Sequence, residues 1–263
     1  MKLLSIALTT YIILFTSLNT KAQNNRLKNA NQIGWYNTFT TVKLSSKFGI
    51  HAEYQWRRTH FISAWQQSLL RVGINYSINP KVLCRIGYAW IETYPYGEYP
   101  INGQGKSFTE HRIYEMVQIS HKENIFEISH RFMLEQRFVG KYSKSNLQKE
   151  DQYPLLNRIR YMCRVQVPLI HKEMTNKTPY IAFYDEIMIG FGKNVNANIF
   201  DQNRFAFLLG YRFNNICRIE AGYLNQVIQL GRQVNSKNIF QYNNGIIINT
   251  YINIDVSKNK KSN

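Results

Sequence analysis

Cysteine and proline are both scarce in this chain of 263 residues, which contains three Cys and six Pro. Cys84, Cys163 and Cys217 are far apart in the sequence, so they do not form the dense disulfide framework of a small secreted domain. The sequence has no Cys-x-x-Cys pair and no Cys/His spacing typical of zinc. We therefore expect no metal site, and nothing in the sequence implies a cofactor.

Long hydrophobic runs are absent after residue 22, so no later segment reaches the ~18 apolar residues that a transmembrane helix needs. The single apolar run, 3–18, follows Lys2 and precedes the small-residue segment Thr20-Lys21-Ala22. This order of a positive residue, an apolar core and a cleavage site predicts a secretory signal peptide over residues 1–22. The mature protein is therefore expected to be exported.

Acidic residues are few, with 16 Asp and Glu against 33 Lys and Arg, which gives a formal net charge of +17. Such an excess can indicate nucleic-acid binding. Here the basic residues are spread along the chain and are not gathered among aromatic residues, so we expect no nucleic-acid partner. Lysines such as Lys141, Lys144 and Lys193 lie between the expected strands and would suit membrane lipids and the phosphates of outer-leaflet glycolipids.

Alternation of apolar and polar residues is the dominant pattern, and no helical period follows residue 22. The pattern predicts eleven strands, joined alternately by short turns and by long loops at 94–107, 139–154, 191–202 and 228–243. The strands are expected at 33–43, 48–58, 64–78, 82–93, 108–119, 125–138, 155–168, 179–190, 203–213, 216–227 and 244–254.

Several of these segments have 11–14 residues, enough for the ~9–11 that cross a bilayer at a tilt, whereas soluble strands centre on ~5–6. We therefore expect an up-and-down antiparallel transmembrane β-barrel with long extracellular loops and short periplasmic turns. Bacterial barrels have even strand numbers, so about twelve strands are expected, with an extra strand in 24–32, and ten are the alternative. A soluble β-sandwich is the competing fold. The barrel domain would cover 23–256, followed by a polar, Lys-rich tail at 257–263.

The two faces of the strands differ in character. One face ends in aromatic residues that would form a girdle at the membrane interface: Trp35, Tyr36, Trp56, Trp65, Tyr88 and Trp90. The other face carries charges that would interlock across the lumen, because a guanidinium binds carboxylates bidentately. This predicted network contains Glu53, Arg57, Glu110, Arg112, Glu127, Arg131, Glu135, Arg137, Arg158, Arg160, Arg164, Glu186, Arg204, Arg212, Arg218 and Glu220.

Several short segments follow one another along the expected strands: Trp35, Glu110-His111-Arg112, Ser129-His130-Arg131, Asn157-Arg158-Ile159-Arg160-Tyr161, Asp201-Gln202-Asn203-Arg204 and Glu220-Ala221-Gly222-Tyr223. With the order of strands, turns and charged rows, these segments make the chain resemble a known family, the outer-membrane β-barrels of Bacteroidetes-type bacteria built on domain of unknown function 2490. The resemblance spans roughly 33–254 and implies a location and an architecture but no established activity.

Three functions remain in order of preference, all in a bacterial outer membrane. The first is a structural or accessory barrel whose lumen is filled by Arg and Glu. The second is a small, porin-like channel that prefers anions, because the lumen rows carry more Arg than Glu. The third is a lipid-acting outer-membrane enzyme, but Ser129 and His130 are adjacent and point to opposite faces, so they cannot pair as nucleophile and base. We expect no catalytic residues.

Overall fold

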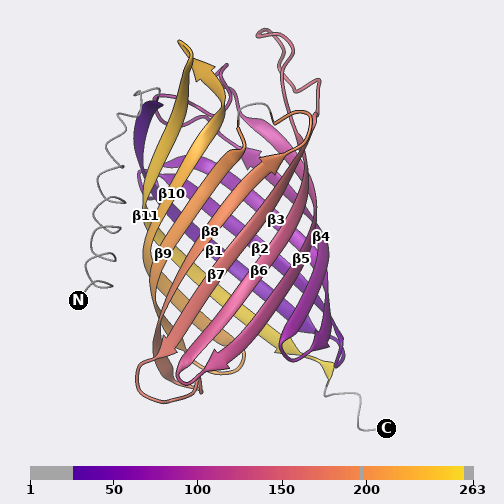
Figure 1. The fold of residues 1–263 in the computed structure, drawn as a ribbon, viewed down its shortest axis with the longest axis vertical. Coiled ribbons are helices and arrows are strands. Elements are labelled where there is room, and N and C mark those ends of the chain that lie inside the picture. Colours follow the sequence, from indigo (N-terminus) through magenta and orange to yellow (C-terminus); the bar gives the residue numbers. More distant parts are fainter. Residues whose placement is uncertain (1–25, 196–197, 258–263) are drawn as a thin grey trace, which may run out of the picture.

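The computed structural model describes residues 26–195 and 198–257, and within them eleven strands form one closed barrel (Figure 1). Each strand pairs with its sequence neighbour, and β1 closes the ring against β11. The strands are β1 (Arg26–Lys43), β2 (Phe48–Thr59), β3 (Ala64–Asn79), β4 (Val82–Thr93), β5 (Phe108–Glu123), β6 (Phe126–Val139), β7 (Leu155–Pro168), β8 (Thr178–Phe191), β9 (Phe200–Arg212), β10 (Cys217–Val234) and β11 (Lys237–Asp255).

The closing pair β1–β11 is parallel, whereas all other pairs are antiparallel. It extends from Arg26 opposite Asn238 to Lys43 opposite Asp255. The expectation of twelve strands is therefore wrong, and so is the alternative of ten. Residues 26–32 do not form a separate strand; they lengthen β1, which runs in the same direction as β11.

The connections on the two rims differ in length. One rim, at the top of Figure 1, carries 94–107 and 140–154, which are the longest connections between strands. The other rim carries the turns at 44–47, 80–81, 124–125 and 213–216 and one longer connection at 169–177. The expected long loop at 228–243 is wrong, because β10 and β11 continue as a hairpin that turns at Asn235 and Ser236, both at positive φ. The predicted signal peptide and nearly all of the predicted tail lie outside the described residues.

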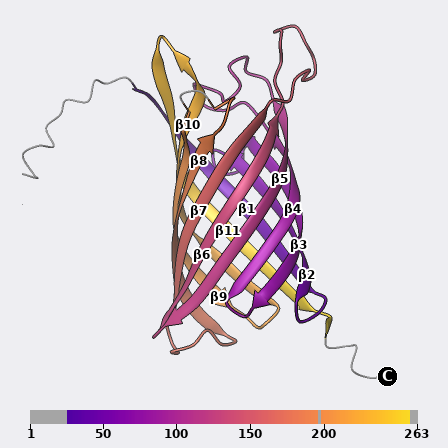
Figure 2. The same cartoon turned by 45° about the vertical axis from the view of Figure 1, so that its right-hand side comes forward.

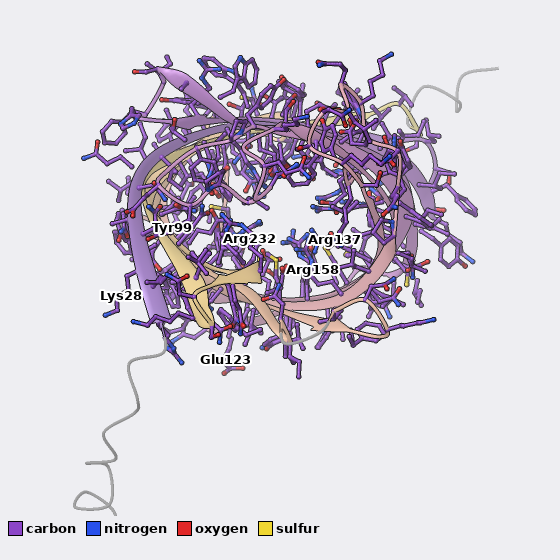
Figure 3. All side chains as sticks on the ribbon, turned by 90° about the horizontal axis from the view of Figure 1, so that it is seen from above. Lys28, Tyr99, Glu123, Arg137, Arg158 and Arg232 are labelled. Carbon is purple, nitrogen blue, oxygen red and sulfur yellow. The ribbon has the colours of Figure 1, made fainter. Side chains whose placement is uncertain are left out.

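The strands are strongly inclined to the barrel axis (Figure 2). Successive side chains of a strand alternate between buried and more exposed positions, so they point alternately into and away from the lumen. Seen along the axis, Arg137 and Arg158 point into the ring, and Lys28 lies on its outside (Figure 3). Charged and amide side chains thus occupy the interior, and large apolar side chains lie exposed on the outer wall. Within residues 26–195 and 198–257, no helix is long and apolar enough to cross a membrane.

Candidate functional site: the charge network of the lumen

Glu135 on β6 is the centre of the lumen, and its side chain is completely buried. Arg158, directly opposite on β7, holds the Oε2 atom with Nε at 2.8 Å and Nη2 at 2.6 Å. Arg160, two residues further along β7, donates from Nη1 to Oε1 at 2.7 Å. The alternation that puts residues two apart on the same face of a strand thus brings both guanidiniums to one carboxylate.

The network continues toward the long-loop rim through Glu110 on β5. Arg137 donates to its two oxygens from Nε at 2.6 Å and from Nη2 at 3.1 Å, and Arg112 donates to Oε1. Arg112 and Arg137 are direct partners in the sheet, so this carboxylate offsets the repulsion between two facing like charges. Asp201 then links the two sides, because it accepts a hydrogen bond from Arg158 and lies 3.6 Å from Arg137 Nη1.

The network continues toward the short-turn rim through Glu186 on β8. Its Oε1 accepts from Arg160 Nη2 at 2.7 Å and from Arg131 Nη2 at 2.8 Å, while Arg204 Nη1 lies 3.5 Å from Oε2. On the far wall, Arg71 donates to Glu53 at 2.5 Å and lies 3.8 Å from Glu135. We call the connected set the charge network: Glu53, Arg71, Glu110, Arg112, Arg131, Glu135, Arg137, Arg158, Arg160, Glu186, Asp201 and Arg204.

A second cluster surrounds Glu220 on β10, nearer the short-turn rim. Arg164 donates to its Oε1, the Tyr180 hydroxyl donates to the same oxygen at 2.7 Å, and the Tyr251 hydroxyl donates to Oε2 at 3.2 Å. Arg218 stacks on the Tyr251 ring, with its Cζ 4.2 Å from the centroid.

Four of the sequence-predicted residues make no ion pair with any described residue: Arg57, Glu127, Arg212 and Arg218. Arg57 and Arg218 instead contact the rings of Trp35 and Tyr251. Glu127 accepts a hydrogen bond from the Gln166 amide at 2.5 Å. Arg212 lies at the short-turn rim, where it donates to the Met174 carbonyl at 2.8 Å and to Asn215. The structure therefore brings most of the predicted residues together in two clusters, but it leaves Arg57 without an ion pair inside the lumen and Arg212 at the rim.

The sequence analysis did not predict Arg71 and Asp201, which belong to the charge network, or Arg85, which lies near it. Arg85 donates to Asn75 at 2.6 Å inside the lumen. On β4, Arg85 shares its inward face with Leu83, Gly87 and Ala89. Because that face is mainly small or apolar, alternation alone does not mark it as the interior. Asp201 lies at an irregularity in the β8–β9 register, which breaks the pattern.

Two cavities among the described residues lie in the lumen. One, of about 700 Å³, extends to the short-turn rim and is lined by Glu53, Arg164 and Lys122 among others; we call it the short-turn cavity. The other, of about 470 Å³, reaches the long loops and is lined by Gln104, Tyr142 and Arg232 among others; we call it the long-loop cavity. Arg57, Arg112 and Arg204 line both cavities, so the layer that contains them separates the two.

Trp35 belongs to this layer, so its assignment to the outer aromatic girdle is wrong. The indole is 2% exposed, its Nε1 donates to Gln66 at 2.7 Å, and the guanidiniums of Arg57 and Arg204 lie 3.8 and 5.0 Å from its ring centroid. The error has a physical origin. Both faces of β1 carry large apolar or aromatic residues, because Ile33 points inward and Tyr36 points outward. The sequence therefore does not show which face of β1 is the inner face.

The other predicted girdle residues lie on the outer wall. Tyr36 contacts Trp56 with 5.2 Å between centroids, and Trp56 contacts Trp65 at 6.2 Å. Tyr88 and Trp90 are both exposed on β4, and the Tyr88 hydroxyl lies 2.6 Å from His111 Nδ1. Arg58 extends over this group, with its Cζ 4.5 Å from the Trp65 centroid.

The loop 94–107 covers part of the long-loop mouth. Its residue Tyr96 is buried, donates to Gln241 at 2.8 Å and accepts from Asn243 at 3.1 Å. Burial raises the pKa of Tyr96, so the hydroxyl keeps its proton and remains a donor at neutral pH. The loop is therefore fastened to β11 inside the barrel mouth.

Comparison with known protein families gives one match. The family model described as "Protein of unknown function (DUF2490)" matches residues 32–237, which is most of the chain. The chain belongs to this family. No curated protein and no solved structure matches it. The match ends at residue 237, the first residue of β11, so nearly all of the strand that closes the barrel lies beyond the matched region.

Proposed function

We propose that this member of the family is an outer-membrane β-barrel with a closed lumen and a structural or accessory role. The observation that carries the membrane placement is the outer wall, where large apolar side chains are exposed on strand after strand. A soluble protein rarely exposes a continuous apolar surface of this extent, whereas a lipid-facing wall requires one. Examples that are at least 39% exposed are Ile50, Leu70, Ile74, Ile86, Ile113, Phe132, Ile159, Phe183, Phe207, Leu209, Tyr223 and Ile246.

Further support comes from the distribution of polar groups. The buried residues include Glu135, Arg158 and Glu220, which reverses the usual order of an apolar interior and a charged surface. A closed barrel also satisfies its backbone groups between strands, as a spanning structure must. An odd strand number is unusual, although membrane barrels with odd numbers exist. In this placement the long loops face outward and contact glycolipid phosphates through their lysines.

The charge network supports the proposal of a closed lumen. Its side chains meet across the interior between the two cavities, and each central carboxylate is held by at least two guanidiniums. Such charge-assisted bonds in a dry interior fix side chains in place. We therefore propose that the network blocks ion flow and stiffens the wall.

A small anion-preferring channel is the second candidate, because one observation favours it. Eleven Lys and Arg side chains but only three Glu line the short-turn cavity, and basic linings select anions. A lipid-acting enzyme receives no support from the wall. His130 faces outward and bonds the Tyr161 hydroxyl at 2.9 Å, whereas Ser129 lines the short-turn cavity.

Two measurements test the proposal. A heat-modifiable shift on semi-native gels after refolding into detergent or liposomes is expected for a membrane barrel; a protein that stays soluble without detergent would contradict the placement. Planar-bilayer recording then tests the lumen, with no current expected at any voltage. A reproducible single-channel current that favours chloride over potassium would instead establish the channel.

A further inference from the structure

Arg57 differs from the other buried arginines because no carboxylate among the described residues lies within ion-pair distance of it. The side chain is 5% exposed. Its two terminal nitrogens donate to the amide oxygens of Gln67, at 2.5 Å, and Gln55, and its Nε has no partner. Its guanidinium also lies against the Trp35 ring. Neutral amides and an indole do not neutralise a buried charge.

The surroundings add to this positive charge. The largest electrostatic influences of other side chains on Arg57 all come from guanidiniums, those of Arg204, Arg112, Arg71 and Arg160. Arg204 itself reaches only one carboxylate, at 3.5 Å, and its Nε also has no partner. Burying an ion without a counter-charge is costly. The described residues provide no carboxylate for Arg57, so an anion from solution would be favourable in this layer.

We propose that a small oxyanion binds in the lumen between Arg57 and Arg204, beside Trp35. Both arginines line the short-turn cavity, so a ligand has room and an approach path with a basic lining. Guanidiniums bind phosphate, sulfate and carboxylate groups through parallel N–H donors, which makes an oxyanion the matching chemistry. The inference concerns the lumen alone and holds whether or not the lumen conducts.

The test uses the full-length protein refolded in a zwitterionic detergent. Inorganic phosphate, sulfate and acetate are titrated separately against chloride at constant ionic strength, while tryptophan emission and the temperature of the gel-mobility shift are recorded. We expect a saturable emission change and a higher unfolding temperature with at least one oxyanion. The three anions distinguish phosphate, sulfate and carboxylate ligands.

Two variants form a matched pair for this titration, because neighbouring residues point to opposite sides of β2. Arg57→Gln removes the lumen charge and should raise the half-saturating oxyanion concentration at least about tenfold. Arg58→Gln removes the charge beside Trp65 on the outer wall and should leave the response unchanged. If Arg57→Gln does not fold, Arg204→Gln is measured in its place, with the same weakening expected.

The basal stability gives an independent readout. In chloride alone, Arg57→Gln should be at least as stable as the wild type, because it removes an unpaired buried charge and its amide can still bond Gln55 or Gln67. The proposal is overturned if the wild type responds to oxyanions no more than to chloride. It is equally overturned if Arg57→Gln, or Arg204→Gln where that is used, binds them as well as the wild type does.

Discussion

Tyr180 lies across Gly210, the residue directly opposite it on β9, and its hydroxyl reaches Glu220 on the strand beyond, at 2.7 Å. A Cβ atom at position 210 would lie 2.3 Å from Tyr180 Cζ. The glycine is therefore what allows the ring to lie flat over the wall. Gly87 and Tyr114 repeat this arrangement between β4 and β5.

Adding a methyl group beneath this ring should destabilise the barrel. Gly210→Ala is expected to cost about 1–3 kcal/mol, because Tyr180 must move away and its bond to Glu220 is weakened. Urea unfolding in detergent, followed by tryptophan emission, measures the change. Gly231→Ala is the control, since the nearest atom to its added Cβ is 3.8 Å away. Equal effects of the two changes would contradict the packing argument.

Breaking the centre of the charge network should be costly. Arg160→Leu removes a guanidinium that serves both Glu135 and Glu186, so two buried carboxylates each lose a partner. The expected loss of unfolding free energy is about 3–5 kcal/mol. Arg212→Leu removes an arginine that makes no ion pair among the described residues and should cost under ~1 kcal/mol. If Arg160→Leu left stability intact and changed ion flux, the pore interpretation would be favoured over the closed one.

Removing a whole ion pair from the network should open the lumen. The double change Glu135→Ala with Arg158→Ala keeps the charge balance and takes away the side chains that meet at the centre. In planar bilayers we expect a current that the wild type lacks, with a reversal potential that shows preference for chloride, because the remaining lining is basic. The matched control, Arg164→Ala with Glu220→Ala, removes a pair outside the network and should stay silent. Currents of equal size in both variants would refute closure by the network.

The parallel closure makes a topological prediction. Single cysteines are introduced into a variant in which Cys84, Cys163 and Cys217 are replaced by Ser. In intact cells, Lys28→Cys at the start of β1 and Lys144→Cys in the 140–154 loop should both react with a membrane-impermeant maleimide. Lys47→Cys, in a turn on the other rim, should react only after lysis. A twelve-stranded barrel would place the start of the first strand with Lys47, so protection of Lys28→Cys would contradict eleven strands.

The sequence predicts the middle of the fold well. The strand expected at 155–168 is observed as Leu155–Pro168. One set of alternate positions is apolar apart from Asn157, and three arginines recur in the other set. The ends of the chain are less predictable. In β11, Asn243 points inward and its neighbour Asn244 points outward, so both faces are polar and alternation fails. The parallel closure has no local signal, since it joins segments more than 200 residues apart.

The charge network is predictable where its partners are adjacent strands. Arg158 and Glu135 lie on two strongly alternating neighbours, and the structure places them directly opposite each other. The partner of Arg164 is Glu220, three strands away, and such a contact across a lumen depends on the barrel diameter. The sequence does not give that diameter, so alternation alone does not identify Glu220 as the partner of Arg164.

Because β1 and β11 run in the same direction, the two ends of the barrel strands are far apart, which affects circular permutation. In an even-stranded barrel both termini lie on one rim, and a short linker joins them for circular permutation. Here Arg26 and Asp255 lie on opposite rims, so a joining linker would have to travel the full height of the wall. A linker through the lumen would meet the charge network, and a linker along the outside would follow the apolar outer wall. A permuted form of this barrel therefore requires a strand to be added or removed first.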